Sequence, residues 1–221
     1  MVSMKNRFFY LLAGLLFALL VSPVASERSP EIHGLTSTAA LLICVFSMST
    51  SRRFHVAGWL LVAAKMLLAA GGHFHPSSAI FVAETIVLFS FFVLAGIFTL
   101  RRVLEEDFVD LNRIAGAISI YMLIGLVWSS LYFFVYLLTP DAFMGLVAPA
   151  GSEVGRLTAI TMDLLYYSYV TLSTLGYGDI TPVGRLAQSL AYLEAICGVM
   201  YVAVLVAALV GSYGNKRVAQ A

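Results

Sequence analysis

Six long apolar stretches limit what this chain can fold into. Three of them exceed the roughly 18 to 20 residues that an α-helix needs to cross the hydrocarbon core of a bilayer, and the other three have 16 or 17 residues. Backbone groups find no water there, so a spanning segment must be a helix or part of a closed barrel. The stretches cover residues 8–24, 35–50, 56–72, 79–100, 114–138 and 186–213. They predict an all-α membrane protein with six transmembrane helices.

The composition agrees with a chain that is surrounded by lipid. Of 221 residues, 61% are hydrophobic and 11% are charged, whereas a soluble domain carries about 25% charged residues. The expected surroundings are therefore the lipid bilayer. A formal net charge of +1 without a basic patch argues against a nucleic-acid partner. No group of nucleophile, base or metal ligands indicates an enzyme, and no cofactor is expected.

Basic residues predict the orientation in the membrane. With six crossings, four basic clusters fall on one side: Lys5 and Arg7, Arg52 and Arg53, Arg101, Arg102 and Arg113, and Lys216 and Arg217. Because positively charged loops stay in the cytoplasm, both termini are expected there.

The first apolar stretch has a second interpretation. Its basic start, apolar middle and small residues at 24–26 resemble a secretory signal peptide. We favour a retained span, because the stretch is somewhat longer than the apolar core of an ordinary signal peptide. Cleavage would leave five crossings without changing the orientation of the rest.

A shorter apolar segment, residues 157–172, precedes the last span and fits a re-entrant helix better than a crossing. We expect Thr158 or Thr161 to cap its start, and the preceding residues 139–156 to form an exposed outer loop. Asp163 would lie in the first turns, where a carboxylate suits the positive end of the helix dipole. The negative end would point toward the bilayer centre and favour a cation.

The nine residues 171–179, Thr-Leu-Ser-Thr-Leu-Gly-Tyr-Gly-Asp, follow this segment. Gly176 and Gly178 permit backbone torsions that a Cβ would forbid. Successive carbonyl groups can therefore lie along one line, and rings of such carbonyls can replace the water shell of K⁺. We expect K⁺, as the permeant ion, to bind at Thr174, Leu175, Gly176 and Tyr177, with Gly178 completing the row.

Several chains are needed to complete such a ring, because one loop supplies only part of it. Four identical subunits around an axis are the natural arrangement, so we expect a homotetramer. The Thr174 hydroxyl would form the innermost ligand layer, and Leu175 and Tyr177 would turn their side chains away from the axis. Asp179 would cap the row on the extracellular side.

The run 171–179 resembles the selectivity filter of the potassium channel superfamily, with Leu175 where the family usually has Val or Ile. By this resemblance Tyr166 and Tyr167 match paired aromatic residues that brace the filter, and Tyr167 would bond to Asp179. Gly198 falls at the family's inner-helix hinge glycine. Glycine also permits close helix packing in membranes, so the packing alternative stays open.

The resemblance implies a potassium-selective channel in a bacterial cell membrane. It divides the chain into a four-span N-terminal domain (1–112), a pore domain (113–214) and a short cytoplasmic tail (215–221). Within the pore domain it implies an outer helix (113–138), a pore helix (157–172), a filter (173–179) and an inner helix (186–213).

Charged residues inside the spans give three further expectations. The fourth span lacks the arginine ladder of a voltage sensor, so steep voltage gating is not expected. Lys65 and Glu84 fall at a similar depth in adjacent spans, which predicts a structural ion pair. Glu194, in the outer half of the last span, would either bond to the pore helix or face a water-filled cavity.

Three alternatives remain for the function. The first is a non-selective cation channel, for which Leu175 leaves room. The second is a subunit of a potassium transporter, a class with four pore repeats where this chain shows one. The third is an accessory membrane protein that keeps the loop as a scaffold.

Overall fold

Seven α-helices dominate the computed structural model, which describes residues 7–28, 30–47, 52–105, 110–147 and 149–218. The helices are α1 (Arg7–Arg28), α2 (Pro30–Ser47), α3 (Arg52–Phe74), α4 (Ser78–Glu105), α5 (Leu111–Leu138), α6 (Glu153–Leu172) and α7 (Arg185–Val218). A 3₁₀ turn (Pro140–Ala142) and two short strands, β1 (Phe143–Met144) and β2 (Thr181–Pro182), complete the described part.

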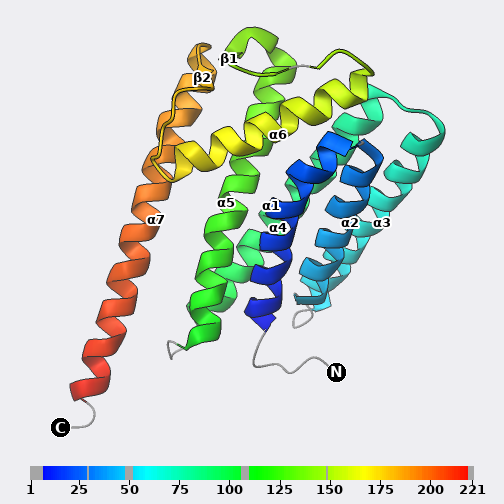
Figure 1. The fold of residues 1–221 in the computed structure, drawn as a ribbon. Helices are drawn as coiled ribbons and strands as arrows, with labels where there is room; N and C mark the ends of the chain where they lie inside the picture. Colours follow the sequence, from blue (N-terminus) through cyan, green and yellow to red (C-terminus); the bar gives the residue numbers. More distant parts are fainter. Residues whose placement is uncertain (1–6, 29, 48–51, 106–109, 148, 219–221) are drawn as a thin grey trace.

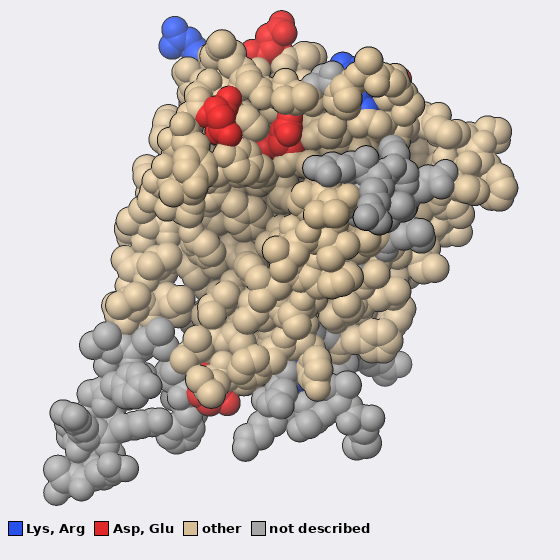
Figure 2. Space-filling model, viewed as in Figure 1, with Lys and Arg blue, Asp and Glu red and all other residues tan. Residues whose placement is uncertain are grey.

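Helices α1 to α5 form a bundle in which successive helices alternate in direction (Figure 1). Helix α6 starts at the end of the bundle that carries the strands and crosses α5 obliquely. Helix α7 follows it on the side of α5 away from α1 to α4 (Figure 1). Helix α1 begins and α7 ends at the same end of the molecule, opposite to β1 and β2. Figure 2 shows charged side chains near the two ends of one face and a wide uncharged band between them, as expected of a membrane protein.

Five of the described helices are long and apolar enough to cross a membrane: α1, α3, α4, α5 and α7. Within the described residues, α2 offers a shorter apolar segment, Thr36–Phe46. The structure thus supports a multi-span helical membrane protein, and the sixth crossing remains a prediction.

One apolar core joins the first four helices to α5 and α6. Leu11 and Leu15 of α1, Phe91 of α4 and Leu123 of α5 are buried in it, together with Leu165 of α6. At the start of α1, the Phe8 amide donates a hydrogen bond to the Asn112 side chain of α5 (3.1 Å). Because the first amides of a helix lack intrahelical partners, this bond ties the end of α1 to α5.

A second core lies at the end of the molecule that carries the strands. Tyr132 and Phe133 of α5 pack there with Phe143, Leu164 and Tyr167. Strands β1 and β2 pair antiparallel, so the segment before α6 is fastened to the segment after residues 173–179. The expected exposed loop at 139–156 is therefore wrong in part, because Ala142 and Phe143 are buried.

Helix α6 begins earlier than the sequence suggested. Ser152 is its N-cap and accepts a hydrogen bond from the Gly155 amide (3.1 Å). The expected caps, Thr158 and Thr161, lie inside the helix, where each donates its hydroxyl to a carbonyl of the preceding turn. Threonine makes this local bond readily, so its presence near an apolar segment did not mark the helix start.

Candidate functional site

The end of α6 anchors the run of residues 173–179. The Ser173 amide bonds to the Tyr169 carbonyl (3.0 Å) and the Thr174 amide to the Thr171 carbonyl (2.9 Å). The Leu175 amide then bonds to the Val170 carbonyl (2.9 Å). These bonds occupy carbonyls of the last helical turn and fix where the extended run begins.

The backbone torsions alternate in sign along the run. Thr174, Gly176 and Gly178 have φ of 60°, 59° and 81°, whereas Leu175 and Tyr177 between them do not have positive φ. Alternation between left- and right-handed conformations turns successive peptide groups toward the same side. The run can therefore present a row of carbonyl oxygens, which is the arrangement that coordinates a dehydrated cation.

Among the described non-glycine residues, Thr174 has a positive φ, of 60°. A residue with a Cβ in this conformation costs roughly 1–2 kcal/mol, so the surroundings must hold it there. The bond from its amide to the Thr171 carbonyl is one such restraint.

One chain leaves this row open on one side. Residues 173–179 are exposed, and the side chains of Leu175 and Tyr177 are 55% and 66% exposed. Both are large apolar groups, which are costly to leave in water. A single copy of the chain thus provides one wall of a site and does not enclose an ion.

The C-terminal end of the run is held by Tyr166. Its hydroxyl donates a hydrogen bond to Asp179 Oδ2 (2.7 Å). This bond lowers the pKa of the Asp179 carboxyl below its usual value, because it favours the charged form.

The expected bond from Tyr167 to Asp179 is wrong. Neighbouring helical side chains point about 100° apart, so Tyr166 faces the run while Tyr167 faces α5. The Tyr167 ring is buried against Tyr132 and Phe143, with ring centroids 5.0 and 5.5 Å apart.

Gly145 is a site residue that the sequence analysis missed. Its φ is +89°, and a Cβ at this position would lie 2.0 Å from the Asp179 carbonyl oxygen. The loop before α6 therefore touches the backbone at the end of the run, and only glycine fits there. A glycine in the short loop before α6 gave no signal of this contact.

Gly198 lies where α7 meets the end of α6. A Cβ there would lie 2.1 Å from the Leu172 carbonyl oxygen, and the Tyr121 hydroxyl of α5 donates to the same oxygen (3.1 Å). The close approach favours the packing interpretation of Gly198. Helix α7 continues unbroken through this position, and a hinge role remains a prediction.

Glu194 occupies a fully buried position between α5, α6 and α7. The Tyr132 hydroxyl donates to Glu194 Oε2 (2.5 Å), and Ser168 Oγ lies 2.5 Å from Glu194 Oε1. Ser168 also lies 2.8 Å from the Gly125 carbonyl oxygen. Of the two roles left open, the structure places Glu194 in contact with the pore helix. Tyr132 and Ser168 were not expected as its partners, because nothing in the sequence links them.

Asp163 lies in the middle of α6 and not in its first turns, because the helix begins at Glu153. Its carboxylate accepts a hydrogen bond from the Val147 amide (2.7 Å). The residue therefore holds the preceding loop against the helix.

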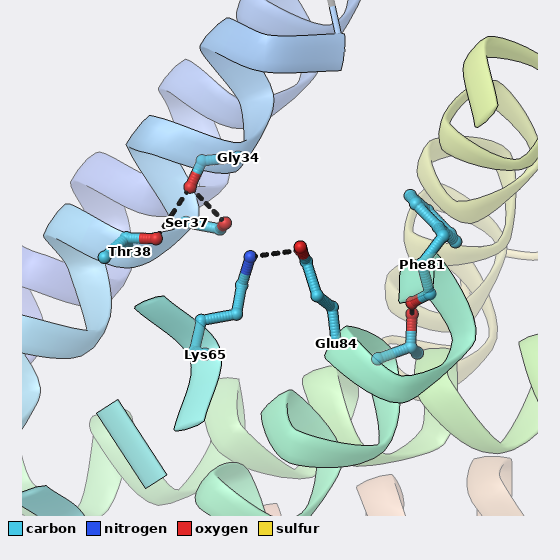
Figure 3. Close-up of polar contacts among 7 residues, drawn as sticks. Gly34, Ser37, Thr38, Lys65, Phe81 and Glu84 are labelled. Atoms are coloured by element: carbon cyan, nitrogen blue, oxygen red, sulfur yellow. Dashed lines mark hydrogen bonds and ion pairs between the residues drawn. The ribbon is translucent and has the colours of Figure 1, made fainter. Parts of the chain in front are cut away.

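Lys65 of α3 and Glu84 of α4 form an ion pair (Figure 3). Lys65 is 1% exposed and Glu84 is 18% exposed. The pair lies away from the run of residues 173–179 and joins two helices of the bundle formed by α1 to α5.

Comparisons with known proteins match the part of the chain that contains this run. The family model described as "Ion channel" matches residues 133–213, which include the end of α5, α6, the run and most of α7. An inward rectifier potassium channel, Kirbac3.1 of Paramagnetospirillum magnetotacticum, is 32% identical over 106 residues. The aligned part covers 47% of this chain and 32% of that relative, so the chain spans about a third of the relative's length. No solved structure matches the chain.

Proposed function

We propose, from the premise that the matched region of this chain belongs to the potassium channel superfamily, that the protein conducts K⁺ passively across a membrane. Both matches point to a channel and not to an enzyme. The observation that carries the proposal is the alternation of φ from Thr174 to Gly178, which can align the carbonyl oxygens of one strand.

The proposed pore is a homotetramer. Four strands around one axis would surround each K⁺ with oxygens and replace its hydration shell. This assembly would also cover Leu175 and Tyr177, whose exposure in one chain supports it. Helix α7 would line the inner cavity, and the C-terminal end of α6 would place its negative dipole near the ion.

The proposed membrane topology has six crossings with both termini in the cytoplasm. The pairing of α2 with α1 and the common end of α1 and α7 support it (Figure 1). Residues 1–112 would then form a four-span domain, 113–214 the pore and 215–221 a cytoplasmic tail in the cell membrane.

Flux in liposomes tests the function. We expect the purified protein to carry K⁺ at channel rates and far faster than Na⁺. The variant Gly178→Ala should lose this flux, because its φ of +81° strains any residue with a Cβ. Gly96→Ala is the matched control, since open space surrounds Gly96 in α4.

Other outcomes favour the alternatives. Equal K⁺ and Na⁺ flux would indicate a non-selective cation channel, which Leu175 in place of Val or Ile makes the second candidate. Absence of channel-rate flux from a folded, assembled protein would indicate a transporter or accessory subunit.

A further inference from the structure

A cavity of about 100 Å³ lies between the first bundle and the pore helix. Its walls come from α1 to α6, and apolar side chains such as Leu15, Leu41, Leu88 and Leu126 form most of them. Lys65 and Glu84 are among its polar lining residues. The cavity is separate from the run of residues 173–179, and nothing in the proposed conduction path uses it.

The Lys65 amine has more hydrogen-bond donors than it has acceptors in the described residues. An ammonium group has three N–H donors, and in the part of the chain that the structure describes Lys65 has one acceptor, Glu84 Oε2. Lys65 is 1% exposed, so bulk water does not supply the others. Figure 3 shows the lysine amine between α2 and Glu84. Buried donors without acceptors are costly, which indicates that another group fills this place.

Hydroxyl oxygens also line this cavity. Ser37, Thr85 and Thr161 line it, and each gives its single hydroxyl hydrogen to a carbonyl of its own helix, at 2.9, 3.0 and 2.8 Å. The remaining lone pairs of these oxygens can accept a hydrogen bond. A ligand here must therefore carry an oxygen that accepts from Lys65 and a hydrogen that it can donate.

Charge and size narrow the class further. Lys65 and Glu84 neutralise each other, so a charged ligand would bring an unbalanced charge into an apolar site. The volume of about 100 Å³ is somewhat smaller than an engineered apolar cavity of about 150 Å³ that holds benzene. We propose that this cavity binds a small neutral amphiphile, a short-chain alcohol, with its hydroxyl at Lys65 and its carbon chain among the leucines.

An occupant of the cavity would contact α6 directly. Thr161, Met162 and Leu165 of α6 line it, and Leu165 belongs to the core that α6 shares with α1 and α5. An occupant that packs against these residues favours one position of α6 over others. This modulatory step rests on the proposed channel function, whereas binding does not.

Photolabelling tests the binding. The probe is a four-carbon alcohol that carries a diazirine, applied to detergent-solubilised protein, with labelled residues mapped by mass spectrometry. We expect saturable labelling of cavity residues, and we expect 1-butanol to compete with the probe and reduce this labelling. Ala18→Leu fills the cavity from α1 and should abolish this labelling. Ala13→Leu, at an exposed position of the same helix, should leave it unchanged.

Three outcomes would overturn the proposal. The first is labelling confined to lipid-facing positions. The second is labelling of the cavity that Ala18→Leu leaves intact while the variant remains folded. The third is equal labelling by a diazirine alkane of the same length, which would show that lipid chains or other purely apolar groups fill the cavity. If Ala18→Leu fails to fold, the competition by 1-butanol and the alkane comparison in the unaltered chain decide.

Flux measurements separate this proposal from the proposed function. If the protein conducts, 1-butanol should change K⁺ flux in the unaltered chain and in Ala13→Leu but not in Ala18→Leu. Specific labelling without any flux would contradict the channel function and leave the binding site supported. Flux without specific labelling would contradict the binding site and leave the channel function supported.

Discussion

Glu194 is the buried residue whose contacts make the sharpest prediction at the residue scale. Ser168 has one hydroxyl hydrogen and two oxygens within reach, on Glu194 and Gly125. A group that donates to Ser168 while accepting from Tyr132 satisfies every partner, and the glutamine side chain can do so. Glu194→Gln should therefore keep the stability of the unaltered chain. Glu194→Ala should lower the unfolding free energy by about 1–3 kcal/mol, because it leaves buried polar groups without partners.

Thermal unfolding in detergent, followed by circular dichroism, checks both variants. Equal destabilisation by alanine and glutamine would contradict the role given to these hydrogen bonds and would point to the charge itself.

Tyr166 and Asp179 give a prediction about pH. The hydrogen bond from Tyr166 lowers the pKa of Asp179, so the bond persists at neutral pH and is lost as pH falls through the lowered value. Titration of ¹³C-labelled aspartate by NMR should show a pKa below the ordinary value of about 3.9. Tyr166→Phe should raise it toward that value. Tyr167→Phe is the control and should not, and a shift of equal size in both variants would contradict the assignment.

At the scale of the element, the contact between α6 and α7 depends on Gly198. Gly198→Ala would drive a methyl group into the Leu172 backbone, and overpacking of this kind costs about 1–3 kcal/mol. We expect a lower unfolding temperature and less assembled protein on size-exclusion chromatography. Gly96→Ala, also inside a helix, should have little effect or stabilise slightly. Tolerance of alanine at position 198 would argue against close packing there.

The elements also show how far the sequence predicts this fold. Long apolar runs located α1, α3, α4, α5 and α7, because a spanning helix is encoded in its own residues. The pairing of β1 with β2 and the contact of Gly145 with Asp179 were not predictable, since two-residue strands and loop contacts depend on segments far apart in the chain. The prediction that Tyr167 bonds to Asp179 failed for a similar reason. The rotation of α6 about its own axis, which brings Tyr166 to Asp179 instead, is set by packing against α5.

At the scale of the whole molecule, the exposed row of residues 173–179 predicts assembly. Native mass spectrometry should give a mass four times that of the 23.9 kDa chain. The assembly should resist heat better in K⁺ than in Na⁺, because an ion bound only by the folded form stabilises it. Gly178→Ala should remove this difference. A monomer in several mild detergents would contradict the shared-axis arrangement.

The charge distribution of the whole molecule predicts weak voltage dependence. Between its ends, α4 carries Glu84 and reaches its first arginine at Arg101, so few charges can move through the membrane field. Current recorded over a range of voltages in planar bilayers should show no steep activation. A fit that needs several elementary charges per channel would contradict this prediction.

The alternating torsions of residues 174–178 make the proposed carbonyl row depend on backbone handedness. Every amino acid contributes the same main-chain oxygen, so a side-chain exchange at Gly176 acts only through the torsion it allows. A mirror-image amino acid favours the left-handed region that its natural counterpart avoids. D-Alanine at Gly176, introduced by chemical ligation, suits the local φ of +59°, whereas L-alanine opposes it. At Gly176, the chirality of a substituted residue thus decides whether its carbonyl can join the row.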